Sequence, residues 1–244
     1  MDTTIWIVGG LAVLSLISGT LGLGVAFAAS PFLSFFMSDF VHQVQPLTLL
    51  LNGLTALFAT LGFAKSGFVD WKKAITLAVV TTLSAPIGSL LAQIISPNFI
   101  LLIYFAAVTF LAYTLFRPVK QQKASENFKL ALILAVPISI LAGFLGVGPG
   151  FLLMPTLIIV GFEPKKAAGI NAFAVTPPSF SALIPHLSTA SWDLSLTLLL
   201  LSVGTIFAFV GARITSRFVA PARLKQNFGI VIVIMTAYKL FTLL

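Results

Sequence analysis

The chain has 244 residues, of which 59% are hydrophobic and only 8% are charged, and its 14 Lys and Arg exceed its 6 Asp and Glu. This composition excludes a soluble globular protein and, since cysteine is absent, also excludes disulfides and thiolate metal sites. The basic excess does not indicate nucleic-acid binding, because the Lys and Arg residues lie in short loops between apolar runs, as is typical of membrane proteins.

Apolar runs cover nearly the whole chain and predict an all-α polytopic membrane protein with no separate soluble domain. A crossing needs about 20 residues. Four runs are shorter, at roughly 11 to 14 residues, and would rise only about 15–20 Å as helices. In chain order the runs are 5–18, 25–37, 44–64, 74–95, 98–116, 130–143, 150–160, 165–186, 194–212 and 222–243.

The four short runs form two pairs, and each pair is joined by a glycine cluster. The segments "SGTLGLGVAFAASPFL" (18–33) and "AGFLGVGPGFLLMPTL" (142–157) match each other at a constant spacing of 124 residues. The matches are Gly19 with Gly143, Gly22 with Gly146, Gly24 with Gly148 and Pro31 with Pro155, and they continue at spacings of 119 to 124 with Asn52 and Asn171, Trp71 and Trp192, Gly88 and Gly211, and Pro97 and Pro221. This duplication predicts an N-terminal transmembrane repeat at 1–117, a linker at 118–128 and a C-terminal repeat at 129–244.

The distribution of Lys and Arg decides between two topologies. If each short pair crosses the membrane as one broken span, the basic residues divide almost evenly between the two faces. If each pair is re-entrant, thirteen lie on one face and only Lys239 on the other, as the positive-inside rule requires. We therefore predict two inverted repeats, each with a re-entrant or broken helix pair and three transmembrane helices, making about eight membrane-embedded units. The basic loops, including 117–129, are predicted to be cytoplasmic and both termini outside.

The glycine clusters predict a binding site. Irregular backbone at membrane depth is tolerated where it lines a cavity, and the start of a half-helix presents free N–H groups and a positive dipole end to an anion. Two alternatives stay open: the glycines can serve close helix packing, and the asparagines can form interhelical hydrogen bonds. The predicted substrate-binding residues are Gly19, Gly22, Gly24, Asn52, Gly146, Gly148, Pro149, Gly150, Asn171, Thr176 and Arg213.

Three further features leave alternatives open. The guanidinium of Arg213 can bind an oxyanion in bidentate fashion or reach toward the lipid headgroups. Pro177 and Pro178 interrupt a span and predict either a hinge or a static bend. His42 and His186 are expected at the outer face, either as ordinary surface histidines or as groups that sense pH.

The predicted spans contain no Asp or Glu, so a buried carboxylate relay for protons is not expected. The sequence also has no nucleophile–base pair, no metal-ligand cluster and no nucleotide-binding loop. We therefore predict neither an enzyme nor a cofactor or metal, and the partners expected are the lipid bilayer and a small anionic substrate, without nucleic acid.

The two glycine segments are each followed by an Asn-centred segment, "LTLLLNGLTALF" and "KKAAGINAFAVT", and together they resemble the TauE/SafE sulfite exporter family, also called the TSUP or four-toluene-sulfonate uptake permease family. The resemblance implies transport of sulfite, organosulfonates or sulfoacetate-like acids across the cytoplasmic membrane. One departure is that Val25 and Ala26 stand where the second copy has Pro149 and Gly150, which predicts that the first glycine turn is degraded.

The function predicted from the sequence is a secondary transporter, an exporter of small sulfur-containing anions. Its mechanism would be alternating access, in which one repeat rocks against the other about a site at the membrane midplane. The alternatives are a channel-like anion pore and a carrier of another small organic anion. The oligomeric state is left open.

Overall fold

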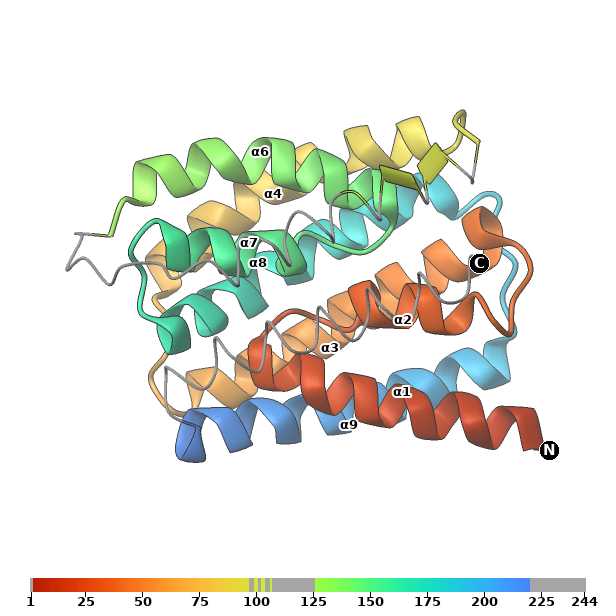
Figure 1. Ribbon diagram of the computed structural model, residues 1–244, viewed down its shortest axis with the longest axis horizontal. Helices are drawn as coiled ribbons and strands as arrows, with labels where there is room; N and C mark the ends of the chain where they lie inside the picture. The colour runs from red at the N-terminus through yellow and green to blue at the C-terminus, as the bar shows by residue number, and fades with distance from the viewer. Residues whose placement is uncertain (1, 97–98, 101, 104–105, 107–125, 220–244) are drawn as a thin grey trace.

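The computed structural model describes residues 2–96, 99–100, 102–103, 106 and 126–219 (Figure 1). This part of the chain contains helices and no strand, which confirms the all-α prediction. The predicted runs 98–116 and 222–243 and the linker 118–128 fall largely outside the described residues. The helices are α1 Asp2–Leu21, α2 Ala26–Leu33, the π-helical η1 Phe40–Val44, α3 Gln45–Ala64, α4 Trp71–Ala92, α6 Phe128–Leu145, α7 Gly150–Ile159, α8 Pro164–Leu183, the 3₁₀-helical η2 Ile184–His186 and α9 Leu194–Phe218.

Six helical segments are long and apolar enough to cross a membrane: α1, η1 with α3, α4, α6, α8 with η2, and α9. Four of them begin at a side chain that caps the first free N–H groups, and for η1 with α3 this side chain is Asp39, which accepts from the N–H groups of Val41 and His42. Asp70 accepts from the N–H of Lys73, and Asp193 accepts from the N–H of Leu196 at 3.0 Å. The side chain of Asn127 accepts from the N–H of Leu130 at the start of α6. The ends of these spans are therefore fixed by short polar loops.

The structure corrects the expected length of two helices. We predicted that both members of each short pair would be half-length, but α1 has 20 residues and α6 has 18, so only α2 and α7 are short. The polar triplet 18–20 stays helical because Gly19 packs on Ala208 of α9 and the Thr20 hydroxyl donates to the Ile17 carbonyl at 2.6 Å. Helix α1 ends only at Gly22, where φ is +65°.

The two helix pairs enter the bundle from opposite ends (Figure 1). Helix α1 runs inward from the end that carries the N-terminus, and after the chain turns, α2 runs back toward that end. Helices α6 and α7 do the same from the other end, and α3 and α8 likewise run in opposite directions. This arrangement is that of two inverted repeats, each with a broken helix pair that turns back within the bundle.

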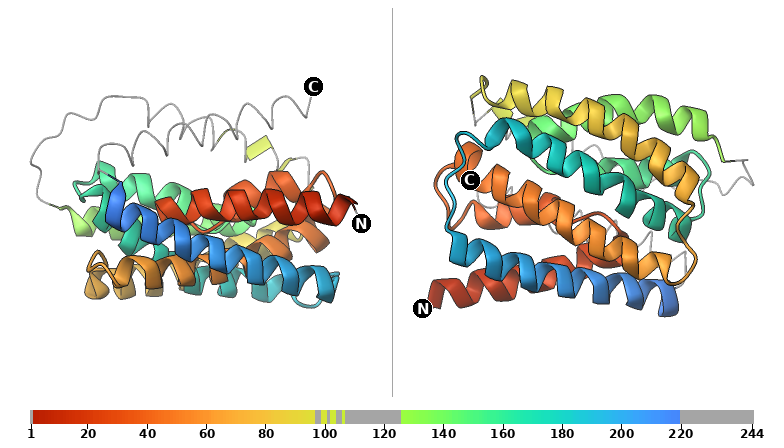
Figure 2. Two further views of the ribbon diagram at one scale, coloured as in Figure 1. Left: turned by 90° about the horizontal axis from the view of Figure 1, so that it is seen from below. Right: turned by 180° about the vertical axis from the view of Figure 1, so that it is seen from behind.

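The repeats are interleaved rather than side by side. Helix α4 of the first repeat packs against α6 and α8 of the second, and α9 of the second repeat packs against α1 and α3 of the first (Figure 2). Helices α3 and α8 pack against each other in the middle. We call α1, α2, α3 and α9 the α3 half, and α4, α6, α7 and α8 the α8 half.

Glycines allow the closest helix contacts in both halves, and they do so at equivalent positions. In the α3 half, a Cβ on Gly19 would meet the Ala208 backbone and one on Gly211 would meet the Leu16 carbonyl. In the α8 half the corresponding contacts join Gly143 to Ala85 and Gly88 to Ile140. The paired residues are 123 or 124 apart in the sequence, so the duplication extends to the helix crossings.

The Lys and Arg residues of the described part gather at one end of the bundle. The ends of α3 and α9 and the starts of α4, α6 and α8 lie at one end of the bundle (Figure 1). These segments carry every Lys and Arg of the described ranges: Lys65, Lys72, Lys73, Lys129, Lys165, Lys166, Arg213 and Arg217. The segments at the opposite end carry Asp2, Asp39 and Asp193.

Candidate functional site

Both helix pairs break in the same way. We call residues 22–25 the first break and 146–149 the second break. Gly22 and Gly24 have φ of +65° and +72°, and Gly146 and Gly148 have φ of +66° and +71°. Only glycine adopts such angles without strain. The expectation that the first turn is degraded is therefore wrong, since the two backbones follow the same path and both are buried.

The backbone N–H groups that follow the second glycine of each break have side-chain hydrogen-bond partners in the first break but, among the described residues, not in the second. In the first break, the N–H of Val25 donates to the Thr55 hydroxyl at 3.2 Å, and the N–H of Ala26 donates to Asn52 Oδ1 at 2.9 Å. The counterpart of Val25 is Pro149, which has no N–H to satisfy. Asn52 thus caps the start of α2 from the neighbouring helix α3.

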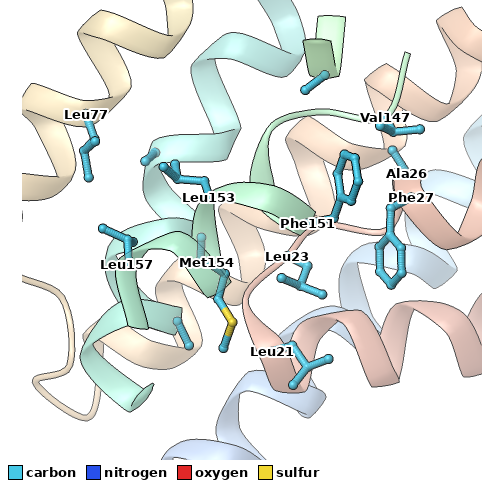
Figure 3. Close-up of a cluster of buried hydrophobic side chains, with 14 of the residues drawn as sticks. Leu21, Leu23, Ala26, Phe27, Leu77, Val147, Phe151, Leu153, Met154 and Leu157 are labelled. Carbon is cyan, nitrogen blue, oxygen red and sulfur yellow. The ribbon is translucent and has the colours of Figure 1, made fainter. Parts of the chain in front are cut away.

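The two breaks meet in the middle of the protein. The rings of Phe27 and Phe151, at the starts of α2 and α7, are parallel within 7° with centroids 6.3 Å apart (Figure 3). A Cβ on Gly24 or on Gly148 would meet the Asn52 amide, and one on Gly150 would meet the carbonyl of Leu23. Gly24 and Gly148 are therefore required by close contacts with the same amide at a shared centre.

Two amides from α3 and α8 lie at this centre. Asn52 uses both ends of its amide, since Nδ2 donates to Ser179 Oγ at 2.8 Å while Oδ1 caps α2. Asn171 Nδ2 donates to the carbonyls of Gly22 at 2.7 Å and Gly150 at 3.3 Å, and so ties the first break to α7. Both side chains are fully buried.

Further polar groups of α3 surround the second break. The Thr48 hydroxyl donates to the Gly146 carbonyl at 3.1 Å and lies 3.2 Å from the hydroxyl of Ser30 on α2. Gln45 donates to the carbonyl of Phe144 at 3.3 Å. The centre is thus lined by amides, hydroxyls and backbone groups without a formal charge.

Three of the predicted site residues lie elsewhere. Gly19 packs within the α1–α9 crossing, and the Thr176 hydroxyl bonds the Ala172 carbonyl of its own helix. Arg213 donates to Ser66 Oγ at 3.0 Å in the basic end of the bundle. It lies nine residues beyond Gly204, which contacts Thr55, and is therefore about 13 Å farther along α9. The structure brings together the other eight candidates.

His186 differs from the expectation of a surface histidine. Its side chain is wholly buried, and Nδ1 lies 2.8 Å from Gln93 Nε2 at the end of α4. The burial follows from the 3₁₀ turn Ile184–His186, which folds the end of α8 back onto α4. His42 lies in η1 and its ring nitrogen Nδ1 pairs with Asp39 at 2.9 Å.

Sequence reasoning missed several residues of this centre. Phe27 and Phe151 are 124 apart, so the duplication pattern that identified the glycines also contained this signal. Gln45 and Ser30 show no such pattern in the sequence, since Gln45 bonds Phe144 of the other repeat and Ser30 bonds Thr48 of the neighbouring helix α3. Their role follows only from the packing of α3 against the breaks.

The chemistry of the centre suits a small anion. The helices α2 and α7 both begin there, and a helix start carries a partial positive charge and N–H groups without partners in the helix. Buried amides and hydroxyls add neutral hydrogen-bonding groups. Within the described residues no group of three or more His, Asp or Glu side chains is placed to hold a metal ion.

Comparison with known proteins identifies relatives among membrane transporters. The sequence pattern of the family described as "Sulfite exporter TauE/SafE" matches residues 6–239. A "Probable membrane transporter protein" of Xylella fastidiosa (strain 9a5c) is 26% identical over 243 residues, covering 94% of this chain and 91% of that protein. The "Probable membrane transporter protein YunE" of Bacillus subtilis (strain 168) is 23% identical over 72% of this chain and 77% of its own.

A plant protein gives a shorter match. The "Sulfite exporter TauE/SafE family protein 3" of Arabidopsis thaliana is 30% identical over 81 residues, which are 33% of this chain and 17% of that protein. No solved structure matches the chain.

Proposed function

Because the chain belongs to the sulfite exporter TauE/SafE family and is thus a multi-pass membrane transporter, we propose that it carries small sulfur-containing anions such as sulfite or organosulfonates out of the cell. The substrate would bind at the shared centre of the two breaks. The residues that would hold it are Gly22, Gly24, Asn52, Gly146, Gly148, Pro149, Gly150 and Asn171.

The observation that carries this proposal is that the starts of α2 and α7 meet at one buried, uncharged centre. Two helix starts directed at the same place produce a positive potential without a Lys or Arg. An anion would be held there by hydrogen bonds and dipoles, which bind more weakly than a buried ion pair and therefore permit release.

The basic end of the bundle would face the cytoplasm. This orientation follows the positive-inside rule and puts the N-terminus and the α8–α9 loop on the outer side. Transport would proceed by alternating access, with the α3 half and the α8 half moving against each other around the breaks.

Uptake into proteoliposomes tests the proposal. Sulfite, sulfate, a sulfonate and acetate would be compared for the wild type, Asn171→Ala, Gly148→Leu and Gly67→Leu. Gly67 is the matched control, because its φ of +74° resembles that of Gly148 but no atom lies within 4 Å of its added Cβ. We expect saturable transport of a sulfur oxyanion that is lost in the first two variants and retained in Gly67→Leu.

Other outcomes would contradict parts of the proposal. Transport that survives both Asn171→Ala and Gly148→Leu would leave these residues a packing role. Saturable acetate transport without any sulfur oxyanion would indicate a carrier of another small organic anion. A flux that does not saturate would indicate a channel-like pore.

A further inference from the structure

The Asn171 amide is only half satisfied. Its Nδ2 donates to the carbonyls of Gly22 and Gly150, but its Oδ1 is fully buried and has no hydrogen-bond partner among the described residues. A buried acceptor without a donor is unfavourable and is rare in folded proteins. The position therefore calls for a functional explanation.

The orphan atom is the oxygen and not the nitrogen of the amide. If the amide were turned over, Oδ1 would face the two backbone carbonyls of Gly22 and Gly150, and acceptor would then lie against acceptor. The hydrogen-bond network thus fixes Nδ2 on the carbonyls. The atom left without a partner at the centre is therefore a hydrogen-bond acceptor, which only an N–H or O–H donor can satisfy.

The equivalent amide in the other repeat, that of Asn52, has no unpaired oxygen. Asn52 Oδ1 accepts from the N–H of Ala26, whose counterpart 124 residues later is Gly150. Asn171 instead donates to the carbonyl of Gly150 and leaves the start of α7 uncapped. An orphan acceptor and the uncapped start of a ten-residue helix therefore lie together at the second break.

A ligand that satisfies both groups must accept hydrogen bonds and also donate one. The start of α7 offers N–H donors and a positive dipole end to oxyanion oxygens, and Asn171 Oδ1 offers an acceptor to an O–H group. On the basis of the proposed function, we propose that the site takes its oxyanion in the monoprotonated form, so that bisulfite, HO–SO₂⁻, is the transported species and Asn171 selects it.

This assignment separates two ligands of equal charge. Bisulfite and methanesulfonate are both monoanions with three oxygens on sulfur, but only bisulfite carries an O–H. Sites built to bond a substrate hydroxyl reject analogues that lack it, because the buried protein group is then left unpaired. Transport of bisulfite would also move one proton with each anion, and a buried Asp or Glu relay would not be needed.

The test measures half-saturation concentrations of sulfite and methanesulfonate in proteoliposomes between pH 6 and pH 8. Sulfite changes from HSO₃⁻ to SO₃²⁻ in this range, whereas methanesulfonate keeps its charge. For the wild type we expect the half-saturation concentration of total sulfite to rise about tenfold per pH unit at the alkaline end, and methanesulfonate to bind at least about tenfold more weakly than bisulfite. Methanesulfonate also reports any pH effect on the protein itself.

Two variants connect the result to the orphan atom. Asn171→Leu keeps the branched shape and the number of side-chain heavy atoms but removes both the acceptor and the Nδ2 donors. Because this variant is expected to lose transport, binding to the purified protein is measured instead, and bisulfite and methanesulfonate are expected to bind within about threefold of each other. Thr60→Val is the control, because the Thr60 hydroxyl is buried but bonds only the Ala56 carbonyl of its own helix. This control should retain the wild-type preference.

The outcomes separate this inference from the proposed function. Sulfite transport that follows SO₃²⁻, or equal affinity for methanesulfonate in the wild type, would overturn the inference and leave the sulfur-anion carrier intact. Loss of transport when choline replaces Na⁺ would assign a cation to the acceptor and would also overturn it. Absence of any saturable sulfur-oxyanion transport would overturn both proposals.

Discussion

The backbone N–H of residue 25 shows how a duplicated site can keep its geometry while its sequence changes. In the first break, Val25 has an N–H, and Thr55 accepts its hydrogen bond. In the second, Pro149 has none, and the counterpart of Thr55, at the spacing of 119 that relates Asn52 to Asn171, is Ala174. A donor and its acceptor are thus present together in one repeat and absent together in the other.

This pairing predicts the effect of Thr55→Val, which keeps the shape of the side chain but removes the acceptor. The Val25 N–H would then be buried without a partner, and the free energy of unfolding should fall by about 1–3 kcal/mol. Adding Val25→Pro removes the donor and should recover most of the loss, since Val25 has φ −93° and Pro149 occupies the same position at φ −74°. Equilibrium unfolding of the purified variants measures both effects. A double variant no more stable than Thr55→Val would show that the hydroxyl acts through other contacts.

At the scale of helices, side-chain hydroxyls of α4 and α8 donate hydrogen bonds to backbone carbonyls of the other helix. Proline removes a helical hydrogen bond and frees the carbonyl four residues earlier. Pro178 frees the carbonyl of Ala174, which accepts from the Thr81 hydroxyl at 3.0 Å. Pro86 frees the carbonyl of Thr82, which accepts from Ser181 at 2.9 Å. The bonded carbonyls favour a static bend in α8 over a hinge.

A double-mutant cycle tests this exchange. Thr81→Val should lower the free energy of unfolding by about 1 kcal/mol because the Ala174 carbonyl loses its donor. In a Pro178→Ala background the same change should cost much less, since the new N–H at 178 can bond that carbonyl within the helix. Thermal and denaturant unfolding of the four proteins give the coupling energy. Equal costs in both backgrounds would mean that Thr81 does not stabilise the proline-freed carbonyl.

Two glycines of α1 should respond oppositely to alanine. Gly19→Ala places a Cβ against the Ala208 backbone, which cannot yield as a side chain can, and should destabilise the protein by about 1–3 kcal/mol. Gly9→Ala, in the same helix with no atom within 4 Å of the new Cβ, should stabilise it by up to about 1 kcal/mol through helix propensity. Unfolding measurements on both variants check the sign. A tolerated Gly19→Ala would mean that α1 and α9 separate easily.

At the scale of the whole molecule, the sequence predicted what depends on local pattern and on duplication. Apolar length and glycine spacing indicated the all-helical fold, the two breaks and their symmetry. Helix lengths at 18–20 were wrong because that polar triplet stays helical only through packing on α9. The hydrogen bonds of Gln45 and Ser179 could not be predicted for the same reason, since each joins segments that meet only after the repeats interleave.

Interleaving also changes which parts can move as units. Helix α4 contacts both α6 and α8, because the Ser89 hydroxyl lies within hydrogen-bond distance of the carbonyls of Gly143 and Ala182 and donates to one of them at a time. Contacts between the two halves include the hydrogen bonds at the breaks, Asn52 with Ser179 and Asn171 with Gly22, together with the packing of α3 on α8. The original expectation that one repeat rocks against the other would break the α4–α6 and α1–α9 packing. Motion of the α3 half against the α8 half keeps both.

Distance measurements between spin labels distinguish these two motions, and the absence of native cysteine allows clean labelling. Leu83 on α4, Ile133 on α6 and Val13 on α1 are exposed on the described structure, at 74%, 60% and 56%. The pair Leu83→Cys with Ile133→Cys joins different repeats within the α8 half, and its distance should stay constant when sulfite is added. The pair Leu83→Cys with Val13→Cys joins one repeat across the two halves, and its distance distribution should shift. The reverse pattern would show that the repeats, and not the interleaved halves, are the moving bodies.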